Sequence, residues 1–74
     1  MYIDDETMIR TIELMAEEGE IKHHHTATRR GYVSRKKTGE VELYKGRYGT
    51  GYIIKRPRWD STNYVYYDYY IIEE

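Results

Sequence analysis

Residues 63–72 read NYVYYDYYII, and aromatic or β-branched side chains fill most of these positions. Such side chains favour extended backbone, because their bulk packs well on a pleated surface. Successive side chains of a strand point to opposite faces, so Val65 and Tyr67 share one face and Tyr64 and Tyr66 share the other. The segment predicts a long strand in which one face covers a helix and the other forms a contact surface.

Tyrosine dominates the aromatic residues, with ten tyrosines, one tryptophan and no phenylalanine. The tyrosine ring is apolar but its hydroxyl seeks water or a hydrogen-bond partner, so tyrosine suits half-buried sheets and interfaces better than a closed core. We therefore expect much of the aromatic surface to lie at or near solvent.

The chain has 74 residues, which limits it to a single domain, residues 1–74, with a small core. Because a chain this short buries little, a homodimer through the tyrosine-rich last strand is one expectation. There is no cysteine, which excludes disulfides and thiolate metal sites and favours a cytoplasmic protein. No stretch approaches the roughly 20 apolar residues of a membrane span, so no membrane contact is expected.

One amphipathic helix is predicted over residues 5–18. Apolar residues recur at the i, i+4, i+7 spacing of one helix face, starting at Met8. Asp4 or Asp5 is suited to cap the helix N-terminus, and Gly19 is suited to end it in a left-handed conformation.

Four strands are expected after the helix, separated by the turn-rich segments KKTGE, KGRYGTG and RPRWDSTN. The first two strands are predicted to form a hairpin whose turn includes Gly39. The predicted fold class is α+β, with one N-terminal amphipathic helix packed on a four-stranded antiparallel β-meander. The expected strands are residues 27–35, 40–45, 52–56 and 63–72.

Acidic and basic residues are segregated along the chain, although its net charge is only -1. Residues 1–20 carry seven acidic side chains and one basic, and residues 21–58 carry eleven basic and two acidic. Residues 59–74 carry four acidic side chains and no basic one. This order predicts a dipolar molecule with one positive side, unlike a uniformly acidic DNA mimic.

The cations of the middle segment interleave with aromatic residues, a combination that joins phosphate neutralisation to base stacking. We expect these cations to form one basic sheet face that meets a macromolecule, with three aromatic residues as anchors: Tyr32, Tyr52 and Trp59. The full set of predicted binding residues is Arg29, Arg30, Tyr32, Arg35, Lys36, Lys37, Tyr52, Lys55, Arg56, Arg58 and Trp59.

Three consecutive histidines, His23, His24 and His25, precede the expected first strand. On extended backbone His23 and His25 point to the same side, but a stable metal site needs a third ligand and only Glu20 is near. An exposed polar run leading to the strand is therefore favoured, and no metal or cofactor is predicted.

Common catalytic motifs are missing, since the chain has no cysteine nucleophile, no G-x-S-x-G and no phosphate-binding loop. The chain is therefore not expected to be an enzyme. One catalytic alternative is a small toxin-like ribonuclease, which can work with histidine, arginine, lysine and tyrosine on a sheet. In that alternative the roles fall to His23, His25, Arg30, Tyr52 and Arg56.

The segments RRGYVSRK, YKGRYGTGY and PRWDSTNYVYYDYY, within residues 29–70, together resemble small accessory proteins of bacteriophages that are short, free of cysteine and rich in tyrosine and charge. The resemblance implies stoichiometric action, in which the protein binds a host or defence enzyme in the host cytoplasm and blocks it, as anti-CRISPR proteins do. It assigns no role to any single residue.

The function expected from residues and resemblance together is a non-catalytic inhibitor of a host enzyme that handles nucleic acid, for example a CRISPR nuclease. Its contact surface is expected to be the basic, tyrosine-rich sheet face. The first alternative is a module that binds DNA or RNA directly, and the second is the toxin-like ribonuclease.

Overall fold

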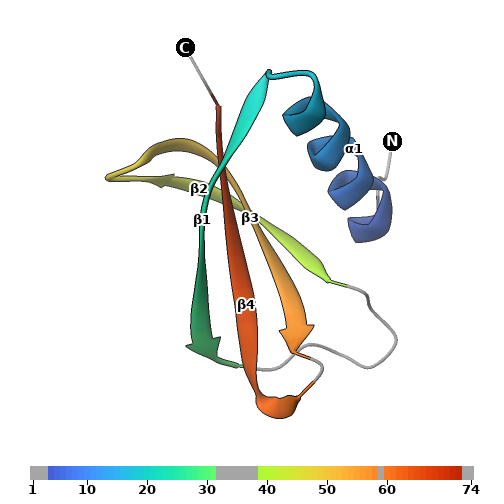
Figure 1. Cartoon of the computed structure of the whole chain (residues 1–74), viewed down its shortest axis with the longest axis vertical. Helices are drawn as coiled ribbons and strands as arrows, with labels where there is room; N and C mark the ends of the chain where they lie inside the picture. Colours follow the sequence, from blue (N-terminus) through green and yellow to red (C-terminus); the bar gives the residue numbers. More distant parts are fainter. Residues whose placement is uncertain (1–3, 32–38, 59, 73–74) are drawn as a thin grey trace.

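The computed structural model describes residues 4–31, 39–58 and 60–72. The described chain forms one helix and a four-stranded antiparallel sheet with the strand order β1-β4-β3-β2 (Figure 1). The predicted α+β class, with one N-terminal helix on four antiparallel strands, is confirmed. The elements are α1 (Asp5–Glu17), β1 (Ile21–Arg30), β2 (Glu40–Gly46), β3 (Gly49–Arg58) and β4 (Ser61–Ile72).

The connection between β1 and β2 differs from the predicted meander. β2, β3 and β4 follow one another across the sheet, but β1 pairs with β4 and lies at the opposite edge from β2. The predicted hairpin with Gly39 in its turn is therefore wrong. In the observed order β1 and β2 are the edge strands, and α1 contacts both of them. This order also makes β4 a central strand.

The ends of α1 are fixed by the residues that the sequence indicated. The Asp4 carboxylate oxygen Oδ1 accepts a hydrogen bond of 2.8 Å from the Thr7 N–H, which satisfies one unpaired donor of the first turn. Asp5 and Glu6 add negative charge where the helix dipole is positive. Gly19 follows the helix with φ of 82°, as predicted.

The cap makes the helix sensitive to acid. The hydrogen bonds from Thr7 lower the pKa of Asp4 below its ordinary value of 3.8. Stability from this cap is therefore present above pH 3.8 and is lost as the pH falls through the folded-state pKa. We expect Asp4→Ala to lower the melting temperature at pH 7. Asp4→Asn should keep much of the cap and lose part of the acid dependence, which thermal denaturation by circular dichroism from pH 2 to 7 would measure.

If Asp4→Ala melted at the wild-type temperature at pH 7, the carboxylate would contribute nothing to the cap. Glu6→Ala is a suitable control, because Glu6 is also acidic and exposed in the first turn but accepts no capping bond from Thr7.

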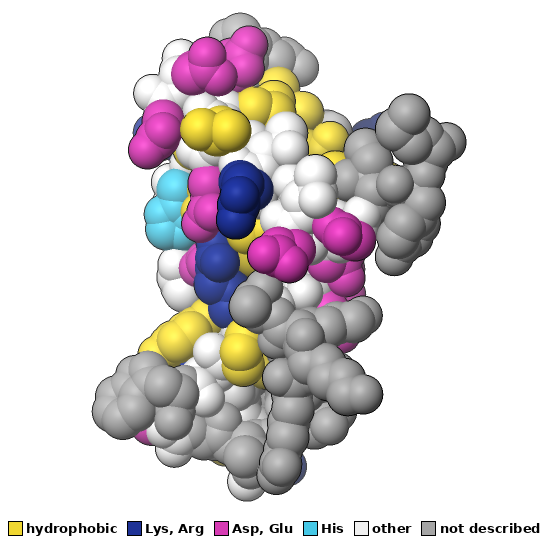
Figure 2. Space-filling model, turned by 90° about the vertical axis from the view of Figure 1, so that its right-hand side faces the viewer, with side chains coloured by type: hydrophobic (Ala, Val, Ile, Leu, Met, Phe, Trp, Pro, Cys, Tyr) yellow, Lys and Arg dark blue, Asp and Glu magenta, His cyan; other side chains and the backbone are white. Residues whose placement is uncertain are grey.

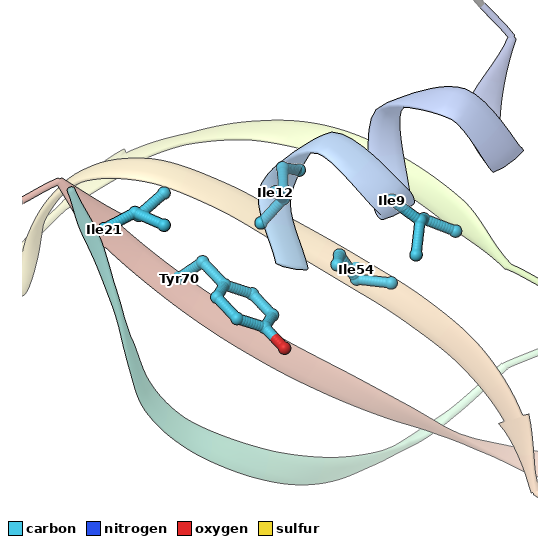
Figure 3. Packing of buried hydrophobic residues seen from close by; sticks show 5 residues of the cluster. All are labelled: Ile9, Ile12, Ile21, Ile54 and Tyr70. Carbon is cyan, nitrogen blue, oxygen red and sulfur yellow. The ribbon is translucent and has the colours of Figure 1, made fainter. Parts of the chain in front are cut away.

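The main core lies between α1 and the sheet (Figure 3). The helix contributes Ile12, as the apolar spacing predicted, and its neighbour Ile9, and the sheet contributes Ile21, Ile54 and Tyr70. Ile54 is fully buried and Ile12 is 1% exposed. These residues come from α1, β1, β3 and β4, so the core joins the helix to three strands.

The opposite face of the sheet has a second packed layer. Ile53, Val65 and Tyr69 are buried there, and the Tyr69 ring stacks on the His25 ring with centroids 4.3 Å apart. Tyr48, in the turn between β2 and β3, contacts the same histidine with ring centroids 5.0 Å apart. The turn of the β2–β3 hairpin thus reaches β1, although β1 and β2 are at opposite edges (Figure 1).

The histidines belong to β1, so the prediction of a polar run before the first strand is wrong. A register shift between His23 and His25 places His24 in a β-bulge. His23 lies against Tyr70 on the helix face, with ring centroids 5.1 Å apart, while His25 lies against Tyr69 on the opposite face. β1 starts at Ile21 because that side chain is only 2% exposed and completes the core.

Candidate binding surface

Five of the eleven predicted binding residues lie outside the described residues: Tyr32, Arg35, Lys36, Lys37 and Trp59. The other six lie on β1 and β3, and they are Arg29, Arg30, Tyr52, Lys55, Arg56 and Arg58.

The described cations do not share one face of the sheet. Arg30 lies opposite Tyr64 and Arg56 opposite Tyr66, on the face that carries α1. Arg29 and Lys55 precede them in the chain, so their side chains point to the other face. The prediction of one basic sheet face is therefore wrong for the described residues, because adjacent cations in a strand are divided between two faces.

Arg56 forms ion pairs with two carboxylates of the same chain. Its Nε donates a hydrogen bond of 2.7 Å to Asp68 Oδ2 on β4, and its Nη2 lies 3.1 Å from Glu13 Oε2 on α1. Burial disfavours the charged guanidinium, but the hydrogen bonds with Asp68 and Tyr70 and the charges of Asp68 and Glu13 raise the pKa of Arg56 overall. This side chain ties the helix to the sheet.

Two further cations have carboxylate partners within the chain. Lys55 Nζ lies 3.9 Å from Glu40 Oε2. Arg58 donates from Nε and Nη2 to the two oxygens of Asp60, at 2.8 and 2.6 Å, and this pair lowers the pKa of Asp60. On the side shown in Figure 2, dark blue and magenta side chains likewise lie next to each other. Within the part of the chain that the structure describes, Arg29 and Arg30 form no ion pair.

Tyr52, the one predicted aromatic anchor among the described residues, is partly buried and packs against the core cluster. Because its ring already contacts core residues, it offers little area to a partner.

Two of the predicted arginines and two tyrosines outside the predicted set form a partly exposed surface on the helix face. The Arg30 guanidinium lies 6.0 Å from the centroid of the Tyr64 ring, and the Arg58 guanidinium lies 5.4 Å from that of Tyr66. Tyr64 is 39% exposed. These residues lie on the part of β1, β4 and β3 that extends beyond α1 (Figure 1). We call Arg30, Arg58, Tyr64 and Tyr66 the arginine–tyrosine surface.

Tyr64 and Tyr66 were absent from the predicted site, yet their position beyond the helix follows from element lengths. A helix of 13 residues is about 20 Å long, whereas a strand of 12 residues extends for about 40 Å. The helix therefore covers only about half of β4. It packs over Tyr70 near the end of this strand and leaves the tyrosines near its beginning open.

A polar chain of contacts adjoins the core at Asp68. The Thr26 hydroxyl donates a hydrogen bond of 2.6 Å to Asp68 Oδ1, and His23 Nε2 lies 3.0 Å from the same hydroxyl oxygen. Because that hydroxyl has a single hydrogen, His23 Nε2 must be the donor in the second contact. Asp68 therefore accepts bonds from β1 and from Arg56 on β3, and it joins three strands.

The residues of the ribonuclease alternative are brought together only in part, since His23 and Arg56 both contact Asp68 on the helix face. His25 lies on the opposite face from His23, Tyr52 packs on the core, and Arg56 is held by two carboxylates. Within residues 4–31, 39–58 and 60–72, no three histidine, aspartate or glutamate side chains are grouped as metal ligands.

No protein family model, curated protein or solved structure matches this chain. The one helix among the described residues is neither long nor apolar enough to cross a bilayer.

Proposed function

We propose that this protein is non-catalytic and binds a partner protein through the arginine–tyrosine surface. The observation that supports this most directly is the exposed Arg30 and Tyr64 pair on the half of the sheet that α1 leaves open. Tyrosine and arginine are enriched in the residues that dominate protein–protein binding energies. A sheet also holds such side chains in a rigid arrangement, which lowers the entropy cost of binding.

The charges favour a protein partner over direct contact with nucleic acid. Strong binding to DNA or RNA requires several cations that neutralise phosphates. On this surface Arg58 is already bound by both oxygens of Asp60, and the neighbouring Arg56 by Asp68 and Glu13. Of the two arginines on this surface, Arg30 forms no ion pair with any described residue.

The partner class in this proposal is a host or defence enzyme that handles nucleic acid, such as a CRISPR nuclease, which the protein inhibits stoichiometrically in the host cytoplasm. Support comes from the resemblance of residues 29–70 to phage accessory proteins. Direct binding of single-stranded DNA or RNA is the second candidate, because the exposed Tyr64 ring beside Arg30 suits base stacking.

Arg30→Ala is expected to weaken partner binding about tenfold or more, as expected when a central interface arginine is removed. Arg29→Ala is a matched control, because Arg29 is the preceding residue, is also exposed, and points to the other face. It should change the affinity less than about twofold, as for a residue outside the interface. The measurement is titration of each variant against the candidate nuclease, with inhibition read at increasing molar ratios.

Equal affinities for the Arg30 and Arg29 variants would remove the arginine–tyrosine surface from the interface. Fluorescence anisotropy with a labelled single-stranded oligonucleotide distinguishes the second candidate. Tight binding to the naked oligonucleotide that falls steeply with salt would favour direct recognition of nucleic acid and contradict the proposal.

A further inference from the structure

The second edge strand, β2, has one side that pairs with no other described strand. Among the residues that the structure describes it pairs only with β3, and the pair Gly46 and Gly49 closes the turn between them. In an antiparallel ladder, alternate residues direct their N–H and C=O groups to opposite sides of the strand. Residues 40, 42, 44 and 46 therefore bond to β3, and Val41, Leu43 and Lys45 direct their backbone groups outwards.

Leu43 lies at the centre of this edge and is 84% exposed. Free sheet edges are commonly protected by bulges, prolines or cations, because they otherwise pair with another strand. The other edge strand, β1, has a bulge at His24 and ends in Arg29 and Arg30. β2 has neither a bulge nor a proline, and its one cation, Lys45, lies at the end next to the turn. The edge formed by β2 is therefore the one suited to accept a strand.

The charges of β2 indicate which strand it accepts. Its first half carries Glu40 and Glu42, whereas Lys45 and the adjacent turn residue Arg47 lie at its other end. A second copy of β2 running antiparallel brings the acidic half of one strand beside the basic half of the other, although Glu42 and Lys45 point to opposite faces and form no direct pair. A parallel copy would place like charges together, which is unfavourable.

We propose that two copies of this chain associate through β2, antiparallel about a twofold axis at Leu43. In this register Leu43 lies opposite Leu43 of the second copy, Val41 opposite Lys45, and Glu42 opposite Tyr44. No like charges are directly opposed, and the outward backbone groups of Val41, Leu43 and Lys45 are paired. The two sheets become one continuous sheet with the two β2 strands at its centre.

This association does not depend on the proposed function. The arginine–tyrosine surface lies on the far ends of β1, β4 and β3 and includes no residue of β2. A protein that dimerises and binds no nuclease, or binds one as a monomer, would separate the two proposals.

Sedimentation equilibrium at several concentrations tests the dimer. We expect wild-type protein to show a monomer–dimer equilibrium and Leu43→Lys to weaken dimerisation by about tenfold or more, since two ammonium groups then meet at the twofold axis. The matched control is Leu14→Lys, a leucine 54% exposed on α1, which should dimerise as the wild type does. A monomeric wild type, or equal dimerisation of both lysine variants, would overturn the proposal.

A second measurement does not depend on the lysine variants folding. The chain has no cysteine, so Leu43→Cys and Leu14→Cys each place one thiol in the molecule. A short crosslinker reactive with thiols at both ends should join two chains of the Leu43→Cys variant rapidly. At the same protein concentration it should join two chains of the Leu14→Cys variant slowly. Equal crosslinking rates for the two variants would contradict the antiparallel arrangement of β2.

Discussion

Replacing Ile12 by alanine is expected to lower the free energy of unfolding by about 2–5 kcal/mol, the usual cost of truncating a buried isoleucine. The Ile12 side chain is 1% exposed and lies between α1 and the sheet (Figure 3). Its removal costs the transfer energy of the lost methyl and methylene groups and leaves a cavity that a short helix cannot fill. At about 0.05–0.15 kcal/mol per residue, a domain of this size has little stability to lose.

The matched control for this change is Leu14→Ala, two residues along the same helix. Leu14 is 54% exposed, so its truncation should leave the stability within about 0.5 kcal/mol of the wild type. Urea denaturation followed by circular dichroism measures both variants. Similar midpoints for the two would mean that α1 does not pack on the sheet as described.

The helix was predictable because its signals are local. The apolar spacing from Met8, the cap and Gly19 all lie close together in the chain, and each acts on its immediate neighbours. The four strands were also recognisable from glycine-rich breaks and β-formers. Class and element types therefore follow from short-range chemistry.

The strand order was not predictable in the same way, because pairing depends on which arrangement closes the core. Ile21 follows the helix directly and is needed beneath it, so β1 begins there and its histidines become part of a strand. β4 then lies between β1 and β3 and pairs with both. A local turn signal such as KKTGE does not show whether the first strand pairs with the second or with the last.

The proposed binding surface includes Arg30 and Arg58, which the sequence prediction named, and two tyrosine neighbours that it did not name. Charge segregation along the chain suggested a free positive face, yet it also allows cations and carboxylates to meet after folding. Arg56 joins Glu13 and Asp68, which are 43 and 12 residues away. The separation of charges in sequence thus serves partly to hold α1 on the sheet.

That role for the charges leads to the second large effect, expected for Asp68→Asn. The Asp68 side chain is 14% exposed and accepts bonds from Arg56 and Thr26. Asparagine keeps the size but removes the charge, which leaves the guanidinium, itself 28% exposed, without its nearest carboxylate. We expect a loss of about 1–3 kcal/mol in the free energy of unfolding, measured in urea.

Asp60→Asn is the matched control, because Asp60 also bonds to an arginine of β3 but is exposed. Solvent and salt screen that pair, so its loss should have a much smaller effect. The variant Arg56→Gln and its combination with Asp68→Asn complete a double-mutant cycle. If the two single effects simply add, Arg56 and Asp68 are not coupled. A double variant no less stable than either single one would instead show that the pair acts as a unit joining β3 to β4.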